Sequence, residues 1–245
     1  MRNWLFIGLT SVLLGRHQPV FGQSRPSDST LVATAERRLQ QQYGRAIGAE
    51  SRLYNGPEYV EYVPPQTRAA FFLTAEAQPA TITYGGNVYA GVPLRYDLVR
   101  AQLVLSTPLG REMRLLNEQV TRFELGAHAF VRLALDSTQA SLAKPDLYEV
   151  LVEGPLQLLA AHHKTLQELN GGGPRGKEIT AKDAFFVRKN QRYYPVDNGA
   201  ALRRLFPARK AALRQYGKEH KLSFRAEERA DALSELVRYL NGLGE

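Results

Sequence analysis

The stretch NGGGPRGKEI, residues 170–179, holds most of the residues of a phosphate-binding loop: Gly171 and, after four residues, Gly176–Lys177. Such a loop surrounds phosphate with backbone N–H groups and needs Ser or Thr after the lysine to hold magnesium. Here Glu178 follows the lysine, and its carboxylate would repel phosphate. Pro174 has no N–H to offer, and the residues that follow lack the apolar stripe of a helix. We therefore interpret the segment as a loop and expect no nucleotide site.

The histidines do not show the spacing of a metal site. His162 and His163 are neighbours in LQLLAAHH, and neighbours on a strand point to opposite faces, so they cannot both bind one ion. His128 and His220 stand alone, and no HExxH or similar spacing occurs. We expect one histidine of the pair to be exposed and the other to pack against the sheet. The chain has no cysteine, which excludes disulfides, thiolate metal sites and a cysteine nucleophile.

Catalytic motifs are equally weak. There is no GxSxG motif, which would place a nucleophilic serine on a sharp turn. Glu149 and Glu153 in YEVLVEG could form the carboxylate pair of a glycosidase only at a spatial separation of about 5 to 10 Å. We expect both to be exposed strand charges. No catalytic, cofactor-binding or metal-binding residue is predicted, and no cofactor is expected.

Two sets of residues are candidates for an interaction surface. Tyrosines are spread through residues 53–197, and a tyrosine buries its ring while keeping a polar tip, which suits the recognition of sugars or proteins. Aromatic residues are also enriched in strands, so packing within a sheet is the competing explanation. Residues 202–221 carry seven cationic side chains against the single acid Glu219. The candidate surface residues are Tyr89, Tyr96, Tyr193, Arg203, Arg204, Arg209 and Lys210.

The basic segment admits two interpretations. A basic amphipathic helix can lie on an anionic membrane surface. The same cations can also form the solvated face of a helix that docks on a sheet. Docking is favoured, because the apolar residues of the segment are medium-sized and intermittent.

The elements that carry these residues follow from hydrophobic periodicity. From about 53 to 165 apolar residues alternate with polar ones, as in VPLRYDL, AQLVLS, VTRFEL and LYEVLV. Strands this closely spaced leave no room for crossover helices, so the sheet should be antiparallel and meandering. A further hairpin is expected to turn at Asn190–Gln191, and from about 199 the apolar period becomes helical, with Pro207 beginning a second helix.

The predicted fold is therefore α+β. A mainly antiparallel β-meander, as a sandwich or a partly closed barrel, is expected over 53–197. A helix near 29–44 lies in the N-terminal segment 23–52, and a helical tail spans 198–245. The tail should cover the sheet or extend from it.

The N-terminus predicts export. Arg2 precedes an apolar run in MRNWLFIGLTSVLLG that is shorter than the roughly 20 residues needed to span a bilayer. Small residues precede a cleavage point at Gly22–Gln23, so residues 1–22 are interpreted as a signal peptide. Its removal lowers the formal charge from +8 to +6, because two arginines and no acid are lost. We expect a periplasmic or extracellular location, with peripheral attachment to the outer membrane as one form of it.

Four segments carry a resemblance to a known family: RLYNGPEYVEY, ITYGGNVYAGVPLRYDLVRAQLVL, YEVLVEGPLQLLAAHHKT and RYYPVDNGAALRRLF. They resemble an uncharacterised family of exported bacterial proteins, mainly of Bacteroidota, over roughly residues 53–240. The resemblance implies export and no assigned activity, so it supplies no site residue. The family's tail is lysine-rich and continuously helical, from which Pro207 and Gly217 depart.

Taken together, the sequence favours a non-enzymatic binding or scaffold protein of the cell envelope. Its expected partner is an envelope protein or an anionic envelope polymer rather than nucleic acid, and the mature chain should have no transmembrane segment. Two alternatives stay open: a carboxylate-dependent extracytoplasmic hydrolase of envelope glycan or peptide, and a peripheral binder of anionic lipid through residues 202–221.

Overall fold

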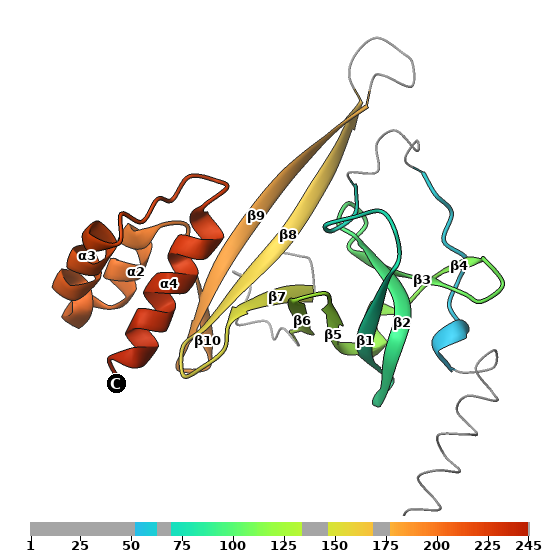
Figure 1. The fold of residues 1–245 in the computed structure, drawn as a ribbon, viewed down its shortest axis with the longest axis horizontal. Helices are drawn as coiled ribbons and strands as arrows, with labels where there is room; N and C mark the ends of the chain where they lie inside the picture. The colour runs from blue at the N-terminus through green and yellow to red at the C-terminus, as the bar shows by residue number, and fades with distance from the viewer. Residues whose placement is uncertain (1–51, 63–69, 134–146, 169–176, 245) are drawn as a thin grey trace, which may run out of the picture. The chain divides into compact units, whose positions relative to one another are not determined.

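The structure is a computed structural model that describes residues 52–62, 70–133, 147–168 and 177–244. Within these ranges ten strands form one antiparallel sheet, and three α-helices follow at the C-terminal end (Figure 1). The strands are β1 (Gln78–Tyr84), β2 (Asn87–Asp97), β3 (Gln102–Ser106), β4 (Glu112–Arg114), β5 (Val120–Leu125), β6 (His128–Arg132), β7 (Leu147–Val152), β8 (Gln157–Glu168), β9 (Lys177–Lys189) and β10 (Arg192–Pro195). Short 3-10 turns are η1 (Arg52–Tyr54), η3 (Asn117–Gln119) and η5 (Pro207–Arg209), and the helices are α2 (Gly199–Leu205), α3 (Lys210–Glu219) and α4 (Arg229–Gly242).

The sheet follows the predicted antiparallel meander with one departure. The strand order is β10-β9-β8-β7-β6-β5-β1-β2-β3-β4, so β5 pairs with β1 rather than with β4. The β9–β10 hairpin turns at Asn190–Gln191, as predicted. Both residues have positive φ, 49° and 64°, which matches the right-handed twist of the flanking strands.

The remaining predictions about the fold concern the closure of the sheet, the N-terminal segment and the glycine-rich segment. The sheet is open, so a sandwich or a partly closed barrel is not confirmed. The helix expected near 29–44 and the signal peptide lie outside the described residues. Strand β8 continues to Glu168 and β9 begins at Lys177, so the glycine-rich segment is flanked by paired strands. A phosphate-binding loop would instead begin a helix at that lysine.

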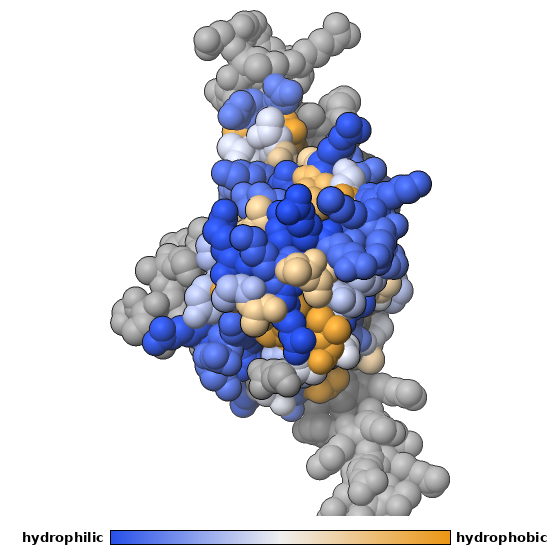
Figure 2. Space-filling view, turned by 90° about the vertical axis from the view of Figure 1, so that its left-hand side faces the viewer, coloured by the Kyte–Doolittle hydropathy of each residue, from blue (hydrophilic) through white to orange (hydrophobic). Residues whose placement is uncertain are grey.

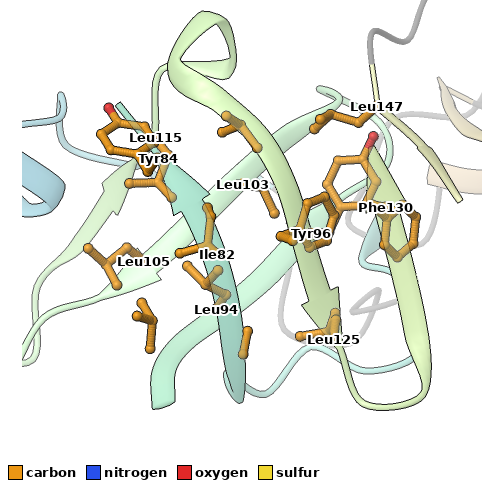
Figure 3. Close-up of a cluster of buried hydrophobic side chains, with 14 of the residues drawn as sticks. Ile82, Tyr84, Leu94, Tyr96, Leu103, Leu105, Leu115, Leu125, Phe130 and Leu147 are labelled. Atoms are coloured by element: carbon orange, nitrogen blue, oxygen red, sulfur yellow. The ribbon is translucent and has the colours of Figure 1, made fainter. Parts of the chain in front are cut away.

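One hydrophobic core lies between the strands β1, β2, β3, β5 and β6. Figure 3 shows side chains from these strands converging on one another, with Ile82, Leu94 and Leu103 fully buried. Phe123 and Phe130 stack with ring centroids 4.5 Å apart, and Tyr96 meets both at near-perpendicular angles. Offset and edge contacts of this kind add to the free energy gained by burial. The alternation read from VPLRYDL is thus the inward face of β2.

A second core joins the helical tail to β7, β8 and β9. Leu202, Leu213 and Leu236 from the three helices are at most 1% exposed and belong to one buried cluster with Leu158 and Val187. Asn198 caps α2 by accepting hydrogen bonds from the amides of Ala200 and Ala201, which otherwise lack helical partners. Pro207 begins the turn that leads into α3, as predicted. The docking of the tail on the sheet is confirmed. None of the helices in the described ranges is long and apolar enough to cross a bilayer.

Candidate functional site

The three candidate tyrosines do not form one surface. Tyr96 is 1% exposed and lies in the first core (Figure 3), so its prediction as a surface residue is wrong. The regular alternation of β2 turns it inward with Leu94. Tyr89 packs half-buried against the same core, whereas Tyr193 packs half-buried on the edge strand β10 against a different cluster. The order of the strands keeps β2 and β10 apart in the sheet.

Of the four candidate cations, only Lys210 lies in a row of cations along α3, together with Arg214 and Lys218 of the same basic segment. Lys210, Arg214 and Lys218 are spaced four residues apart, which places them on one face of the helix, and all three are exposed. Leu213 is buried against the second core, so the opposite face is docked. We call these three cations the basic stripe. Lys210 was predicted, and the other two lie in the same basic segment.

The basic stripe has no acidic counterpart within the described residues. None of its cations forms an ion pair there, and the nearby Glu235 contacts His220 instead. Like charges four residues apart each destabilise a helix by about 0.2–0.5 kcal/mol. The stripe lines a shallow hollow of about 580 Å³ together with Pro207 and Ala208. The row of cations is therefore unfavourable for the helix itself and open to an external anion.

The remaining predicted cations lie beside the stripe. Arg204 is exposed on α2 and Arg203 is half-buried there. Arg209 is exposed in η5 and donates a hydrogen bond to the carbonyl oxygen of Gly244 at 3.2 Å. Figure 2 views the side on which α2 and α3 lie, and hydrophilic side chains cover most of it, with smaller apolar areas between them.

A row of ionisable side chains, which sequence reasoning did not find, crosses four neighbouring strands. His128 of β6 contacts Glu149 of β7 at 2.5 Å through Nδ1, and His162 of β8 contacts the other oxygen of Glu149 at 2.6 Å through Nε2. His162 Nδ1 lies 2.9 Å from Oδ1 of Asp183 on β9. We call these four residues the polar seam.

The polar seam separates the two cores on one face of the sheet. On β7, Leu147 belongs to the first core and Leu151 packs against the second, and Glu149 lies between them on the same face. Phe72 covers the seam, with its ring centroid 5.0 Å from that of His128 and 5.2 Å from that of His162. Glu149 is only 6% exposed, so the prediction that it is an exposed strand charge is wrong. Glu153, predicted alike, is exposed.

The contacts within the seam determine its charge. Burial by itself lowers the pKa of His162, but the hydrogen bonds to Asp183 and Glu149 outweigh it and raise that pKa to about 9. Burial raises the pKa of Glu149, yet its bonds to the two histidines leave that pKa below the usual value. At neutral pH, His162 is thus an imidazolium held between two carboxylates. His163, its neighbour, is exposed, as expected for one histidine of the pair.

The seam is a row of histidine–carboxylate contacts rather than a metal-binding cluster. Its ring nitrogens point at carboxylate oxygens, and no group of three or more His, Asp or Glu side chains in the described ranges is placed to hold a metal. His128 is 35% exposed, and Glu149 orients its ring. A carboxylate that orients a histidine also occurs in catalytic triads, where the histidine is the general base.

Comparison with protein-family models, with curated proteins and with solved structures finds no match.

A second buried charge lies close to the seam at the end of β2. Asp97 is fully buried and accepts hydrogen bonds from the hydroxyls of Tyr59 and Tyr62, each at 3.0 Å, and from the amides of Val99 and Arg100. Burial and the Asp97 carboxylate both raise the pKa values of the two tyrosines, so they stay protonated donors. We call Asp97 and these four donors the Asp97 cluster.

Lys164 lies between the Asp97 cluster and the seam. Its ammonium donates to the carbonyl oxygen of Phe71 at 2.7 Å, and its amide donates to that of Leu98. Burial lowers the pKa of Lys164, while the charges of Asp183 and Asp97 act in the opposite direction. The segment that carries Phe71 and Phe72 is thus held at both the seam and the Asp97 cluster.

The raised pKa of His162 predicts a pH dependence of stability. Its pKa is higher in the folded protein, about 9, than the ordinary 6.5, so the stabilisation is fully present below pH 6.5 and is lost as the pH rises through 9. The shift corresponds to a loss of about 3 kcal/mol in the free energy of unfolding across that window. Urea denaturation at a series of pH values measures it.

The matched control is His162→Gln, in which the step between pH 6.5 and 9 should disappear. Subtracting the stability profile of this variant removes the contribution of lysines and tyrosines. Equal slopes for the two proteins across this window would show that His162 is not held as an imidazolium.

Proposed function

We propose that this chain is an exported, non-enzymatic binding protein of the cell envelope that attaches to an anionic lipid surface through the basic stripe. The observation that carries the proposal is the row of three exposed cations without an acidic partner in the described ranges. The apolar side of α3 is already occupied by the core, so the stripe faces outward on a helix of fixed orientation.

An anionic surface would relieve the repulsion within the stripe. A cation close to a surface of anionic lipids gains about 1 kcal/mol, and the gain decays within a Debye length. Three cations on one rigid face can approach a flat surface together, without the ordering cost of a disordered basic segment. Pro207 and Ala208 in the same hollow add small apolar groups that can enter the head-group region.

Export supports the choice of an envelope surface. The signal-like residues 1–22 and the resemblance to exported bacterial proteins both favour it, and the net positive charge suits anionic envelope components. The tyrosines do not add a joint surface, because Tyr96 lies in the core and Tyr89 and Tyr193 lie on separate strands.

The carboxylate-dependent hydrolase is the alternative, and the pairing of His128 with Glu149 is the observation in its favour. Neither of the two cavities lined by the helical tail includes a residue of the seam. A binding role is therefore preferred.

The test is cosedimentation of the purified protein with vesicles. Binding to phosphatidylglycerol-containing vesicles is expected, with none to pure phosphatidylcholine and with weakening as salt is raised. The triple variant Lys210→Gln, Arg214→Gln and Lys218→Gln should lose roughly 100-fold in affinity, because about 1 kcal/mol is lost per cation.

The matched control removes the same charge elsewhere. The triple variant Arg111→Gln, Lys182→Gln and Arg192→Gln neutralises three exposed cations, two on strands of the sheet and one in the β3–β4 turn. It should bind nearly as the unmodified protein does. Equal losses in the two variants would mean that net charge, and not the stripe, determines binding, which contradicts the proposal. The stripe variant should unfold no more readily, because it relieves like-charge repulsion.

A further inference from the structure

A second cavity shares Pro207 and Ala208 with the hollow of the basic stripe and differs from it in character. It has a volume of about 500 Å³, within the range typical of small-molecule sites. It is bounded by the β7–β8 turn, by η5 and the residue before it, and by the end of α4. Its lining is mainly apolar, with Pro155, Leu156, Phe206, Pro207, Ala208 and Leu240.

The walls of this cavity are fixed by hydrogen bonds. Asn241 of α4 accepts from the amide of Leu156 and donates to its carbonyl oxygen, both at 2.9 Å, so the helix end is clamped to the β7–β8 turn. Gly154 in that turn leaves room for this clamp, since a Cβ there would lie 2.7 Å from the amide nitrogen of Asn241. A cavity with fixed walls loses little order when a ligand enters.

Among the described residues, two cations and no acid line the cavity. Lys189 donates to the carbonyl oxygen of Leu205 at 3.1 Å, and Arg209 donates to that of Gly244 at 3.2 Å. Neither forms an ion pair with a carboxylate in the described part of the chain. An ammonium has three N–H groups and a guanidinium has five, so each cation keeps donors for a further acceptor. Cations beside apolar walls are stabilised when an anion pairs with them.

The lining also indicates what kind of ligand cannot be recognised well. Both polar atoms of the Asn241 side chain hydrogen-bond to Leu156, and the ammonium of Lys189 lies over the ring of Phe206 at 4.5 Å. The side chains of the lining are polar only at Lys189, Arg209 and Asn241, so most polar groups of a sugar or a nucleobase would be left unpaired on the apolar walls. An aliphatic chain has no such requirement.

We infer that this cavity binds a long-chain fatty carboxylate, with the alkyl chain against the apolar walls and the carboxylate between Lys189 and Arg209. A carboxylate matches the two cations, and the chain matches the aliphatic lining. The inference goes beyond attachment to a lipid surface, because the basic stripe contributes neither cation, and each can hold without the other.

The experiment is calorimetric titration of the full chain with dodecanoate below its micellar concentration. Binding of one dodecanoate per chain is expected. Butyrate, which has the head but not the chain, and dodecyl maltoside, which has the chain but a neutral head, should bind at least roughly tenfold more weakly. Dodecyl maltoside that binds as tightly as dodecanoate would overturn the assignment of the two cations.

Variants distinguish dodecanoate binding in the cavity from binding to cations elsewhere on the surface. Arg209→Met and Lys189→Met should each weaken dodecanoate binding roughly tenfold, because each removes a charged hydrogen-bond donor. Arg204→Met, which removes an exposed cation of α2 outside the cavity lining, should bind as the unmodified protein does. Ala208→Trp, at an exposed position of the lining, should fill the cavity and abolish binding. Unchanged binding in that variant would overturn the site.

A measurement on the unmodified protein keeps the inference testable if a variant does not fold. A photoreactive dodecanoate should label peptides that contain residues 155–156, 206–209 or 240–244. Labelling confined to other peptides would show that the ligand binds elsewhere. The vesicle assay is independent, because its stripe variant leaves both Lys189 and Arg209 unchanged.

Discussion

Replacement of Glu149 by glutamine is expected to lower the free energy of unfolding by about 3–5 kcal/mol, because it leaves a buried imidazolium without one of its two counter-charges. Glu149 is 6% exposed, and its two oxygens serve His128 and His162 separately. A glutamine has one acceptor oxygen, so one histidine would face an N–H group in place of a carboxylate oxygen. Urea denaturation near neutral pH measures the loss.

The controls for this prediction lie within the seam. His128→Gln should cost about 1 kcal/mol, since His128 is 35% exposed and one of its contacts is replaced by water. In the Glu149→Gln protein the pKa of His162 should fall, so the loss of stability between pH 6.5 and 9 should become smaller. A cost no larger than that of His128→Gln would mean that the seam is well hydrated and contributes little.

Replacement of Asp97 by alanine should be similarly severe, at about 4 kcal/mol or more. Four donors, two of them tyrosine hydroxyls, converge on this fully buried carboxylate, and alanine would leave them unpaired. The effect should reach the segment around Phe71, whose carbonyl oxygen accepts from Lys164 beside the cluster. Hydrogen exchange of the amide of Phe72, which donates to the carbonyl oxygen of Tyr96, should quicken as well.

Graded substitutions separate the contribution that the charge of Asp97 makes to stability from the contribution of its hydrogen bonds. Asp97→Asn keeps one acceptor oxygen, which can still serve the amides of Val99 and Arg100, so it should cost less than alanine. Tyr59→Phe removes one hydroxyl and should cost about 1 kcal/mol. If Asp97→Ala costs no more than Tyr59→Phe, the four hydrogen bonds are not the source of the stability.

The Glu149 prediction follows from the architecture of the sheet. One face of the sheet carries two hydrophobic cores, and the polar seam lies where one core ends and the other begins. Asp97 faces the other side of β2, where Tyr59 belongs to a separate cluster with Phe71 and Val104. Buried ion pairs contribute little net free energy compared with apolar residues of the same size, but the loss of one partner is costly. Single substitutions in the seam should therefore be far more harmful than the joint replacement of Glu149 and His162 by apolar residues.

Much of the secondary structure could be predicted from the sequence. Alternation in VPLRYDL and LYEVLV, the turn at Asn190–Gln191 and the helical period after residue 199 all depend on interactions within a few residues. Close spacing of the strands was enough to predict antiparallel pairing. The basic character of residues 202–221 was also apparent from the sequence, but the row of Lys210, Arg214 and Lys218 was recognised only on α3 of the structure.

The polar seam depended on tertiary structure. His128, Glu149, His162 and Asp183 come from four strands, and each strand shows only one of them. Strand pairing places His162 opposite Asp183, and Glu149 between Phe130 and Ala160. One signal was present: in LYEVLV a carboxylate occupies the same face as Leu147 and Leu151, where an apolar residue would be expected. It could not indicate which partners would meet that carboxylate.

The sequence by itself determined the local elements and the charge carried by α3, because these follow from backbone propensity and periodicity over short distances. Tertiary structure decided which charges are buried, that Tyr96 lies in the core, and that Lys189 and Arg209 line one cavity. Those outcomes depend on strand order and on how the helices dock, and both arise from contacts between residues far apart in the chain. Burial and long-range pairing determine the chemistry of a side chain. The sequence of a single strand or helix indicates neither of them.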